Sequence, residues 1–251
     1  MAFVPAADID EVIARLEALV AGFRSGGSRL GYFPALYLKV TRAVREGIRT
    51  GRFQDGPRMD RLDTVFANRY LAALHAWQAG EPCSECWRVA FESAGRWRPT
   101  ILQHLLLGMA AHIQLDLGVA AAEVAPGARL ATLKTDFMAI NEILGALSGE
   151  VQEALDGLSP WLGVLDVAGG DLDEALARFG LNAVRDGAWA FAQELALLEP
   201  TARGEALQRA DAAVAANAKL LARPLPLMAF LCLLVRLPET GDPRRVIEAL
   251  A

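Results

Sequence analysis

The chain has 251 residues and a mass of 27.0 kDa, a size that fits one compact domain or two small ones. Because 53% of the residues are hydrophobic and 22% are charged, the chain can bury a substantial core, which excludes intrinsic disorder. The net charge of −5 and the lack of any Lys/Arg tract argue against nucleic acid as a partner.

The sequence also bears on the compartment. The N-terminal residues have no basic stretch followed by an apolar one, so no export signal is predicted. The longest strongly apolar run, Pro226–Val235, is shorter than the roughly 20 residues that a membrane span needs. The three cysteines are too few for a disulfide scaffold and fit a reducing compartment. We therefore expect a cytoplasmic protein without a membrane span, in an oligomeric state that the sequence leaves open.

The pair Cys83-x-x-Cys86 lacks both the βαβ context of a thioredoxin-like site and the second C-x-x-C of a zinc ribbon. We interpret these residues as ordinary thiols at the start of a helix, with a redox site or part of a metal site as the alternative.

Helical periodicity extends through almost the whole chain. Asp8 and Glu11 form a capping box before a first helix with apolar residues at three- and four-residue spacing. Pro34, Pro57 and Pro99 suit the first turns of later helices. Further helices are predicted over residues 130–147, shortly after 148, and over 171–198, 202–222, 226–237 and 243–250.

No segment alternates apolar and polar residues with β-branched enrichment, so no sheet is predicted. The fold class that follows is all-α, a multi-helix bundle around a buried central helix at about residues 101–122. No repeat or low-complexity linker divides residues 1–251, which favours a single domain; a weak boundary near 158–171 is the alternative.

The predicted central helix carries polar residues although it is apolar nearly all round. A helix without a broad polar face belongs inside a bundle, so His104, His112 and Asp116 should be buried. A buried carboxylate must be paired, metal-bound or protonated. His112 and Asp116 are four residues apart and can face the same neighbour, whereas His104 joins them only in a wide site. Gly108 would let another helix or a ligand approach closely.

Two other helices offer partners for the central one. Asp63 and Arg69 lie on the helix that starts near Pro57, and Asp136 interrupts an otherwise apolar helix. A guanidinium near the core needs an anionic partner, so we expect Arg69 to reach Asp63, Asp116 or Asp136.

Across Gly31–Asn141, the segments GYFPALYLKVTRAVREGI, FQDGPRMDRLDTVFANRYL, ILQHLLLGMAAHIQLDLGVA and DFMAINEIL resemble an uncharacterised bacterial family carried as a domain of unknown function. That resemblance implies a helical fold and assigns no activity.

A more distant similarity is to the zinc-dependent phospholipase C family, through the pair His112-x-x-x-Asp116 alone. The resemblance implies that both residues bind metal, with Asp63 and His75 as loosely matched upstream ligands. This chain has only three histidines, too few for a three-metal site. One divalent ion, Zn, Fe or Mn, would be held by His112 and Asp116 with Asp63 or Asp136.

The leading expectation is a small-molecule enzyme with a mostly apolar site between helices, of hydrolase or cyclase/lyase type. The candidate catalytic residues are His112, Asp116, His104, Asp63 and Arg69. Without a metal, Asp116 would orient His112 and raise its basicity for proton transfer; with one, both would help to activate water. The alternative is a non-catalytic protein that binds an apolar ligand or partner, in which the His/Asp cluster is structural.

Overall fold

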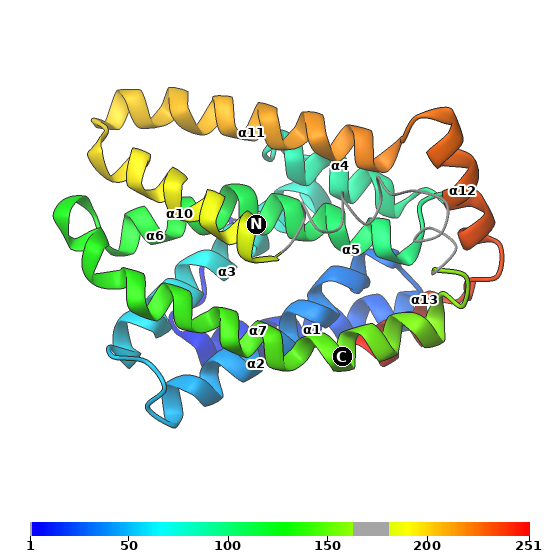
Figure 1. The fold of residues 1–251 in the computed structure, drawn as a ribbon, viewed down its shortest axis with the longest axis horizontal. Helices are drawn as coiled ribbons and strands as arrows, with labels where there is room; N and C mark the ends of the chain where they lie inside the picture. Colours follow the sequence, from blue (N-terminus) through cyan, green and yellow to red (C-terminus); the bar gives the residue numbers. More distant parts are fainter. Residues whose placement is uncertain (1, 163–180) are drawn as a thin grey trace.

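A computed structural model describes residues 2–162 and 181–251 of the chain, and all regular structure in these ranges is helical. The helices form a bundle around one long central helix, which lies between α11 on one side and α7 on the other in Figure 1. This arrangement confirms the all-α fold predicted from the sequence.

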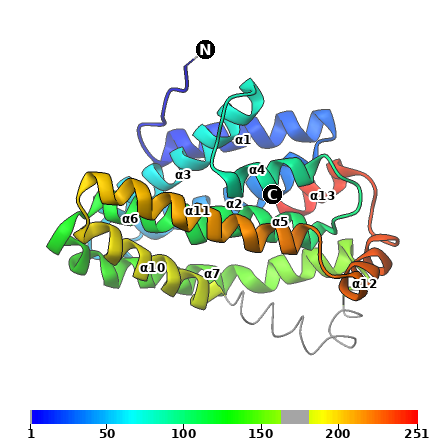
Figure 2. The same ribbon diagram turned by 90° about the horizontal axis from the view of Figure 1, so that it is seen from above.

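The helices outside the central one have the following bounds: α1 Ile9–Gly26, α2 Tyr32–Arg49, α3 Gly56–Ala79, α4 Glu85–Ala94, α7 Leu130–Leu158, α10 Leu181–Leu197, α11 Pro200–Ala222, α12 Pro226–Arg236 and α13 Pro243–Leu250. Short 3-10 turns at Arg29–Gly31 and Gly127–Arg129 precede α2 and α7. Seen from above in Figure 2, α1 lies on the far side of the bundle from α7, and α12 lies at one end.

Local capping explains where α1 and α3 begin and end. The Asp8 side chain accepts a hydrogen bond from the Glu11 amide, and Asp55 accepts one from the Arg58 amide, so each helix has a carboxylate at its N-terminus. Both helices end at a glycine in the left-handed conformation, Gly27 with φ 62° and Gly80 with φ 72°. The predicted cap at Asp8 is thus confirmed, whereas Glu11 accepts from the Ala7 amide instead of closing the predicted capping box.

The central helix consists of three consecutive sections, α5 (Ile101–Met109), a π-helical segment (Ala110–Leu117) and α6 (Gly118–Val124). The α5 section packs on α2, α4 and α11, the π-helical segment packs on α3, α10 and α11, and α6 packs on α3 and α10. Two glycines allow close contacts: a Cβ on Gly108 would lie 2.6 Å from the Phe33 ring, and one on Gly118 would lie 2.8 Å from the Ala188 carbonyl oxygen. The close approach expected at Gly108 is therefore made by α2.

The N-terminus of the central helix is held by a buried glutamate that the sequence analysis did not identify. Both carboxylate oxygens of Glu239 accept from the Ile101 amide, at 3.2 and 3.1 Å, and one of them also accepts from the Ser159 hydroxyl. Glu239 therefore joins the start of the central helix to the end of α7 and to the segment before α13.

The prediction for residues 130–158 was wrong in one respect. Instead of two helices separated near Ser148, α7 is continuous from Leu130 to Leu158. Gly149 costs helix stability only modestly, and the flanking turns carry good helix formers, so the chain has no reason to break there. The predicted start of a helix at residue 171 and most of the alternative boundary near 158–171 lie outside the described residues.

Within the described part of the chain, the helix Ile101–Val124 is long and apolar enough to cross a membrane, and α11 with α12, bent by 63°, meets the same criterion as a pair. Most of the central helix is buried inside the protein. Buried core helices have this same composition, so the feature alone is weak evidence for a span.

Candidate functional site

The buried carboxylate of Asp116 is held by two helices. Its Oδ1 accepts a hydrogen bond from Arg69 Nε of α3 at 2.7 Å, and its Oδ2 accepts one from the indole Nε1 of Trp87 of α4, also at 2.7 Å. Asp116 is 2% exposed, whereas the Arg69 side chain is 28% exposed. Burial raises the pKa of Asp116, while the Arg69 charge and the Trp87 bond oppose that shift. The prediction that Arg69 pairs with a carboxylate is thus confirmed, and of the three candidates the partner is Asp116.

The backbone around Asp116 is π-helical, with the widened turns that such segments share. His112 and Asp116 both lie in this segment and both face α3. They contact different residues there: His112 stacks on Phe66, and Asp116 bonds Arg69, three positions later on α3. Segments of this kind are rare and occur frequently at functional sites.

A cleft of about 750 Å³ opens beside this carboxylate. One face of α3 forms a wall, and the small side chains of Ala72 and Ala76 leave room on it. Trp87 and Asp116 contribute to the lining from α4 and the π-helical segment. The other lining residues are Pro5, Ala6, Ala7, Arg61, Thr64, Val65, Asn68, Arg69, Ala73, Pro82, Cys83, Ser84 and Glu123. The cleft thus combines apolar surface with two arginines, Arg61 and Arg69, and two acidic residues, Asp116 and Glu123.

The N-terminal segment forms one edge of the cleft because Asn68 binds its backbone. The Ala6 amide donates to Asn68 Oδ1 at 2.7 Å, and Asn68 Nδ2 donates to the Ala6 carbonyl at 2.9 Å. Asp60 adds a bond from the Ile9 amide at 3.2 Å. On α3, Asn68 and Asp60 thus hold the N-terminal segment, whereas Arg69 faces the cleft.

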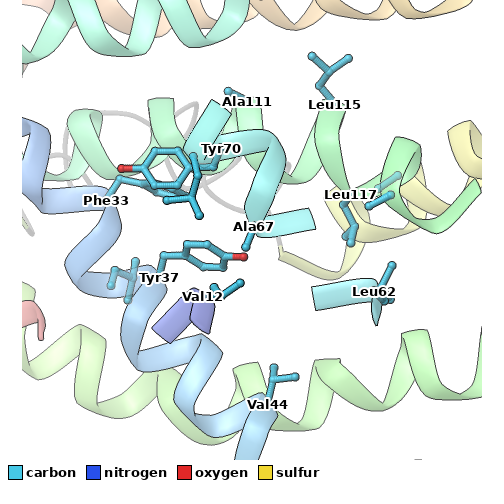
Figure 3. Close-up of a cluster of buried hydrophobic side chains, with 14 of the residues drawn as sticks. Val12, Phe33, Tyr37, Val44, Leu62, Ala67, Tyr70, Ala111, Leu115 and Leu117 are labelled. Atoms are coloured by element: carbon cyan, nitrogen blue, oxygen red, sulfur yellow. The ribbon is translucent and has the colours of Figure 1, made fainter. Parts of the chain in front are cut away.

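His112 lies in a cluster of aromatic rings and makes no bond to Asp116. Its ring stacks on Phe66 with centroids 3.5 Å apart, and Tyr37 and Phe33 lie edge-on at 4.4 and 5.4 Å. Figure 3 shows Phe33, Tyr37 and Tyr70 of this cluster within the hydrophobic core. Neither imidazole nitrogen has a hydrogen-bond partner within the described residues. Burial, together with the nearby Arg69 charge, lowers the pKa of His112 well below its usual range.

The acid–base pair expected from the sequence is therefore wrong in its geometry. Both oxygens of Asp116 are engaged by Arg69 and Trp87, so Asp116 neither orients His112 nor raises its basicity. Burial of both residues is confirmed, since His112 is 3% exposed. Only Asp116 is bonded to other helices.

Asp63 is buried on the core side of α3 and does not line the cleft. Its Oδ2 atom has no hydrogen-bond partner within the described residues. Burial, with a further contribution from the negative charge of Asp60, raises the pKa of Asp63 to about 7. The charge of Asp63 in turn helps to raise the pKa of Tyr37, which places these two groups near one another in the core.

His104 lies away from Asp116, in a small hollow of about 20 Å³ that Arg29 and Gly108 also line. Its ring packs edge-on to Tyr32 with centroids 5.7 Å apart. Burial and the charges of Arg29 and Arg236 lower the pKa of His104 to about 3. The structure therefore does not bring His104 into the cleft.

Asp136 stabilises the start of α3 instead of joining the cleft. Its carboxylate accepts from the Gln54 amide at 2.7 Å, the Asp55 amide at 3.1 Å and Arg58 Nη2 at 2.8 Å. These three bonds compensate for the burial of the carboxylate. They explain why a charged residue is tolerated on the apolar face of α7.

The metal site expected from His112, Asp116, Asp63 and Asp136 does not fit the structure. Within residues 2–162 and 181–251, no group of three or more His, Cys, Asp or Glu side chains could hold a metal ion. The guanidinium of Arg69 already contacts Asp116 and would repel a second cation there. We therefore derive no chemical step through Zn, Fe or Mn.

The cysteine pair shows no sign of a reactive thiolate. Cys83 lines the cleft and Cys86 is buried, and both are free thiols. Burial raises the pKa of each thiol, which disfavours the nucleophilic form. The amide of Cys86 donates to Asp211 of α11, so the start of α4 is held from another helix. The interpretation of ordinary thiols at a helix start agrees with this geometry.

Sequence reasoning missed three contributors to the site: Trp87, Asn68 and the N-terminal segment. No local signal identifies Trp87 as a hydrogen-bond donor to Asp116, because the two are distant in the sequence. Only a general rule points to Trp87: a buried indole N–H needs an acceptor, and a buried carboxylate needs donors.

Comparison with known proteins gives one family. A family model described as a family of unknown function (DUF5995) matches residues 9–224, most of the chain. No curated protein matches, and no solved structure does. The similarity to the zinc-dependent phospholipase C family is not shown by these comparisons.

Proposed function

We propose that this chain, which belongs to the family of unknown function DUF5995, binds a small organic anion in the cleft beside Asp116. Arg69 would be the residue that holds the anionic group. The observation that carries the proposal is the arrangement of Arg69, whose Nε is fixed by a buried carboxylate while its side chain lines a 750 Å³ cleft.

The geometry of Arg69 favours anion binding. Only its Nε is engaged, so its two terminal nitrogens have no hydrogen-bond partner within the described residues. Asp116 keeps the guanidinium in place, and this preorganisation reduces the entropy lost when a ligand binds. A guanidinium with two free nitrogens suits carboxylates and phosphates, which accept paired hydrogen bonds.

The other residues that line the cleft indicate that the rest of the ligand is apolar. Val65, Ala72, Ala76 and Trp87 offer apolar contacts, as small-molecule sites commonly do. Arg61 stands eight residues before Arg69 on α3, about 12 Å along the helix axis. A molecule with an anionic group near Arg69 and an apolar body along α3 fits this lining better than the purely apolar ligand expected from the sequence.

A matched ligand series tests the proposal. Benzoate and phenyl phosphate carry the anion, whereas benzamide has a similar ring without charge. We expect both anions to bind by saturation-transfer NMR and to perturb the indole resonance of Trp87, and we expect benzamide to bind at least about tenfold more weakly, the equivalent of about 1.4 kcal/mol.

Two variants serve as the comparison. Arg69→Lys keeps the charge and the partner of Asp116 but loses the planar fork, so it should weaken phenyl phosphate binding. Arg45→Gln removes an exposed arginine of α2 that pairs with Asp10 outside the cleft, and it should leave binding unchanged. Equal binding of benzoate and benzamide, or equal weakening by both variants, would contradict the proposal.

A second candidate function, proton transfer to the bound molecule, is favoured by the position of Asp116. Its carboxyl lines the cleft, its pKa is raised by burial, and it lies on a π-helical segment. In this version Asp116 exchanges a proton with the ligand, and Arg69 holds the ligand's anionic group. Incorporation of solvent deuterium at the carbon next to the carboxylate of a bound ligand, absent in Asp116→Asn, would distinguish catalysis from binding alone.

A further inference from the structure

Large apolar side chains are concentrated on the surface at the start of α12, far from the cleft. Leu225 is 75% exposed, Leu227 73% and Phe230 57%, and together they form a protruding apolar tip. Trp97 is half exposed and lies beside the other end of α12, since its carbonyl accepts from Arg236 Nε at 2.9 Å. An exposed apolar patch of this kind usually marks an interaction surface.

Arginines surround the apolar tip. Arg96, Arg98 and Arg223 line a hollow of about 540 Å³ that Phe230 and Leu233 also line. Arg98 and Arg223 are exposed and form no ion pair within the described residues. Arg96 has one distant carboxylate, that of Glu92 at 3.8 Å. The lining of this hollow is therefore basic although the whole chain carries a charge of −5.

From this combination we propose that the α12 end of the bundle docks on a membrane surface that contains anionic phospholipids. The apolar tip Leu225–Phe230 would enter the boundary between headgroups and acyl chains, and Arg98 and Arg223 would contact lipid phosphates. Charge complementarity selects this partner: arginines beside exposed leucine, phenylalanine and tryptophan match a surface that is apolar inside and negative outside.

The position of α12 allows such contact. In Figures 1 and 2, α12 lies at one end of the bundle, with the turn from α11 to α12 at its edge. The junction of α10 and α11 lies at the opposite end in Figure 1, and it carries another exposed leucine, Leu197, which is 83% exposed. Leu197 therefore provides a control of equal chemistry at a distant place.

Vesicle sedimentation with the full chain tests the proposal. One set of vesicles contains equal parts of phosphatidylcholine and phosphatidylglycerol, and the other contains phosphatidylcholine alone. We expect the wild type to bind the anionic vesicles, to bind less as salt increases, and to show a blue shift of tryptophan emission. Leu227→Glu should lower the partition coefficient about tenfold or more, and Leu197→Glu should leave it unchanged.

The double variant Arg98→Gln/Arg223→Gln isolates the charge contribution. Two arginines near an anionic surface should change the partition coefficient roughly thirtyfold. Equal binding to both kinds of vesicle, or equal loss in Leu227→Glu and Leu197→Glu, would overturn the proposal. The proposal would also be overturned if the wild type binds no vesicle and forms a dimer in sedimentation velocity that is lost in Leu227→Glu. The apolar tip would then bind a second copy of the chain.

Discussion

Replacing Asp63 with asparagine should stabilise the protein at neutral and alkaline pH. Asp63 is 7% exposed, and its Oδ2 atom has no hydrogen-bond partner in the part of the chain that the structure describes. Asp60, one turn earlier on α3, adds a second negative charge nearby. Ionised Asp63 therefore costs folding free energy, and a neutral amide of the same shape avoids that cost.

The raised pKa gives the size and sign of the effect. Folding shifts the pKa of Asp63 from 3.8 to about 7, so the folded state holds a proton that the unfolded state releases between these values. The contribution of Asp63 to stability therefore falls as pH rises from about 4 to about 7, by about 4 kcal/mol in total. Relative to the wild type, Asp63→Asn should gain about 2 kcal/mol at about pH 5 and about 4 kcal/mol at about pH 8.

Urea denaturation followed by circular dichroism at the two pH values measures this difference. Asp136→Asn is the matched control: that aspartate is buried as well, but its carboxylate accepts three hydrogen bonds, so the substitution should destabilise by about 3 kcal/mol or more. The reasoning is refuted if Asp63→Asn is no more stable than the wild type at about pH 8, or if its gain is independent of pH.

Three further predictions can be tested by substitution. Gly118→Ala should destabilise by about 1–3 kcal/mol because its Cβ would meet a backbone carbonyl of α10 at 2.8 Å, whereas Gly187→Ala, with nothing within 4 Å, should gain about 0.5–1 kcal/mol in thermal or urea unfolding. Asn68→Ala should release the N-terminal segment and speed thermolysin cleavage before α1; an unchanged cleavage rate would argue against its role. Arg69→Gln should cost about 3–5 kcal/mol, more than Asp116→Asn, because the partly exposed arginine can be rehydrated and the buried carboxylate cannot. The reverse order in urea unfolding would be inconsistent with this difference in burial between the two partners.

Features set by residues close in sequence could be predicted well. The cap at Asp8 and the start of α3 beside Pro57 depend on short-range hydrogen bonds and backbone preferences, which the sequence displays directly. Burial of the central helix followed from its lack of a polar face. That Arg69 pairs with a carboxylate followed from electrostatics, because a buried carboxylate and a cation near the core need each other, but the sequence left Asp63, Asp116 and Asp136 open as partners.

Features set by long-range packing could not be predicted. The π-helical segment leaves the composition of the helix unchanged, so hydrophobic periodicity does not reveal it. The separation of His112 from Asp116 follows from which α3 residue each one meets, Phe66 or Arg69. The spacing along one helix indicates that two residues share a face. The contacts that each residue makes there depend on the neighbouring helices, which the spacing does not show.

The π-helical segment also sets the rotation of one half of the central helix relative to the other. Each residue of an α-helix turns the chain by about 100°, so the widened turns between α5 and α6 set which way α6 faces. Gly108, before the segment, meets α2, and Gly118, after it, meets α10. Shortening the segment by one residue would turn Gly118 away from α10 while leaving α5 in place. The length of this stretch is therefore constrained independently of its side chains, and insertions or deletions here should be tolerated far less well than substitutions.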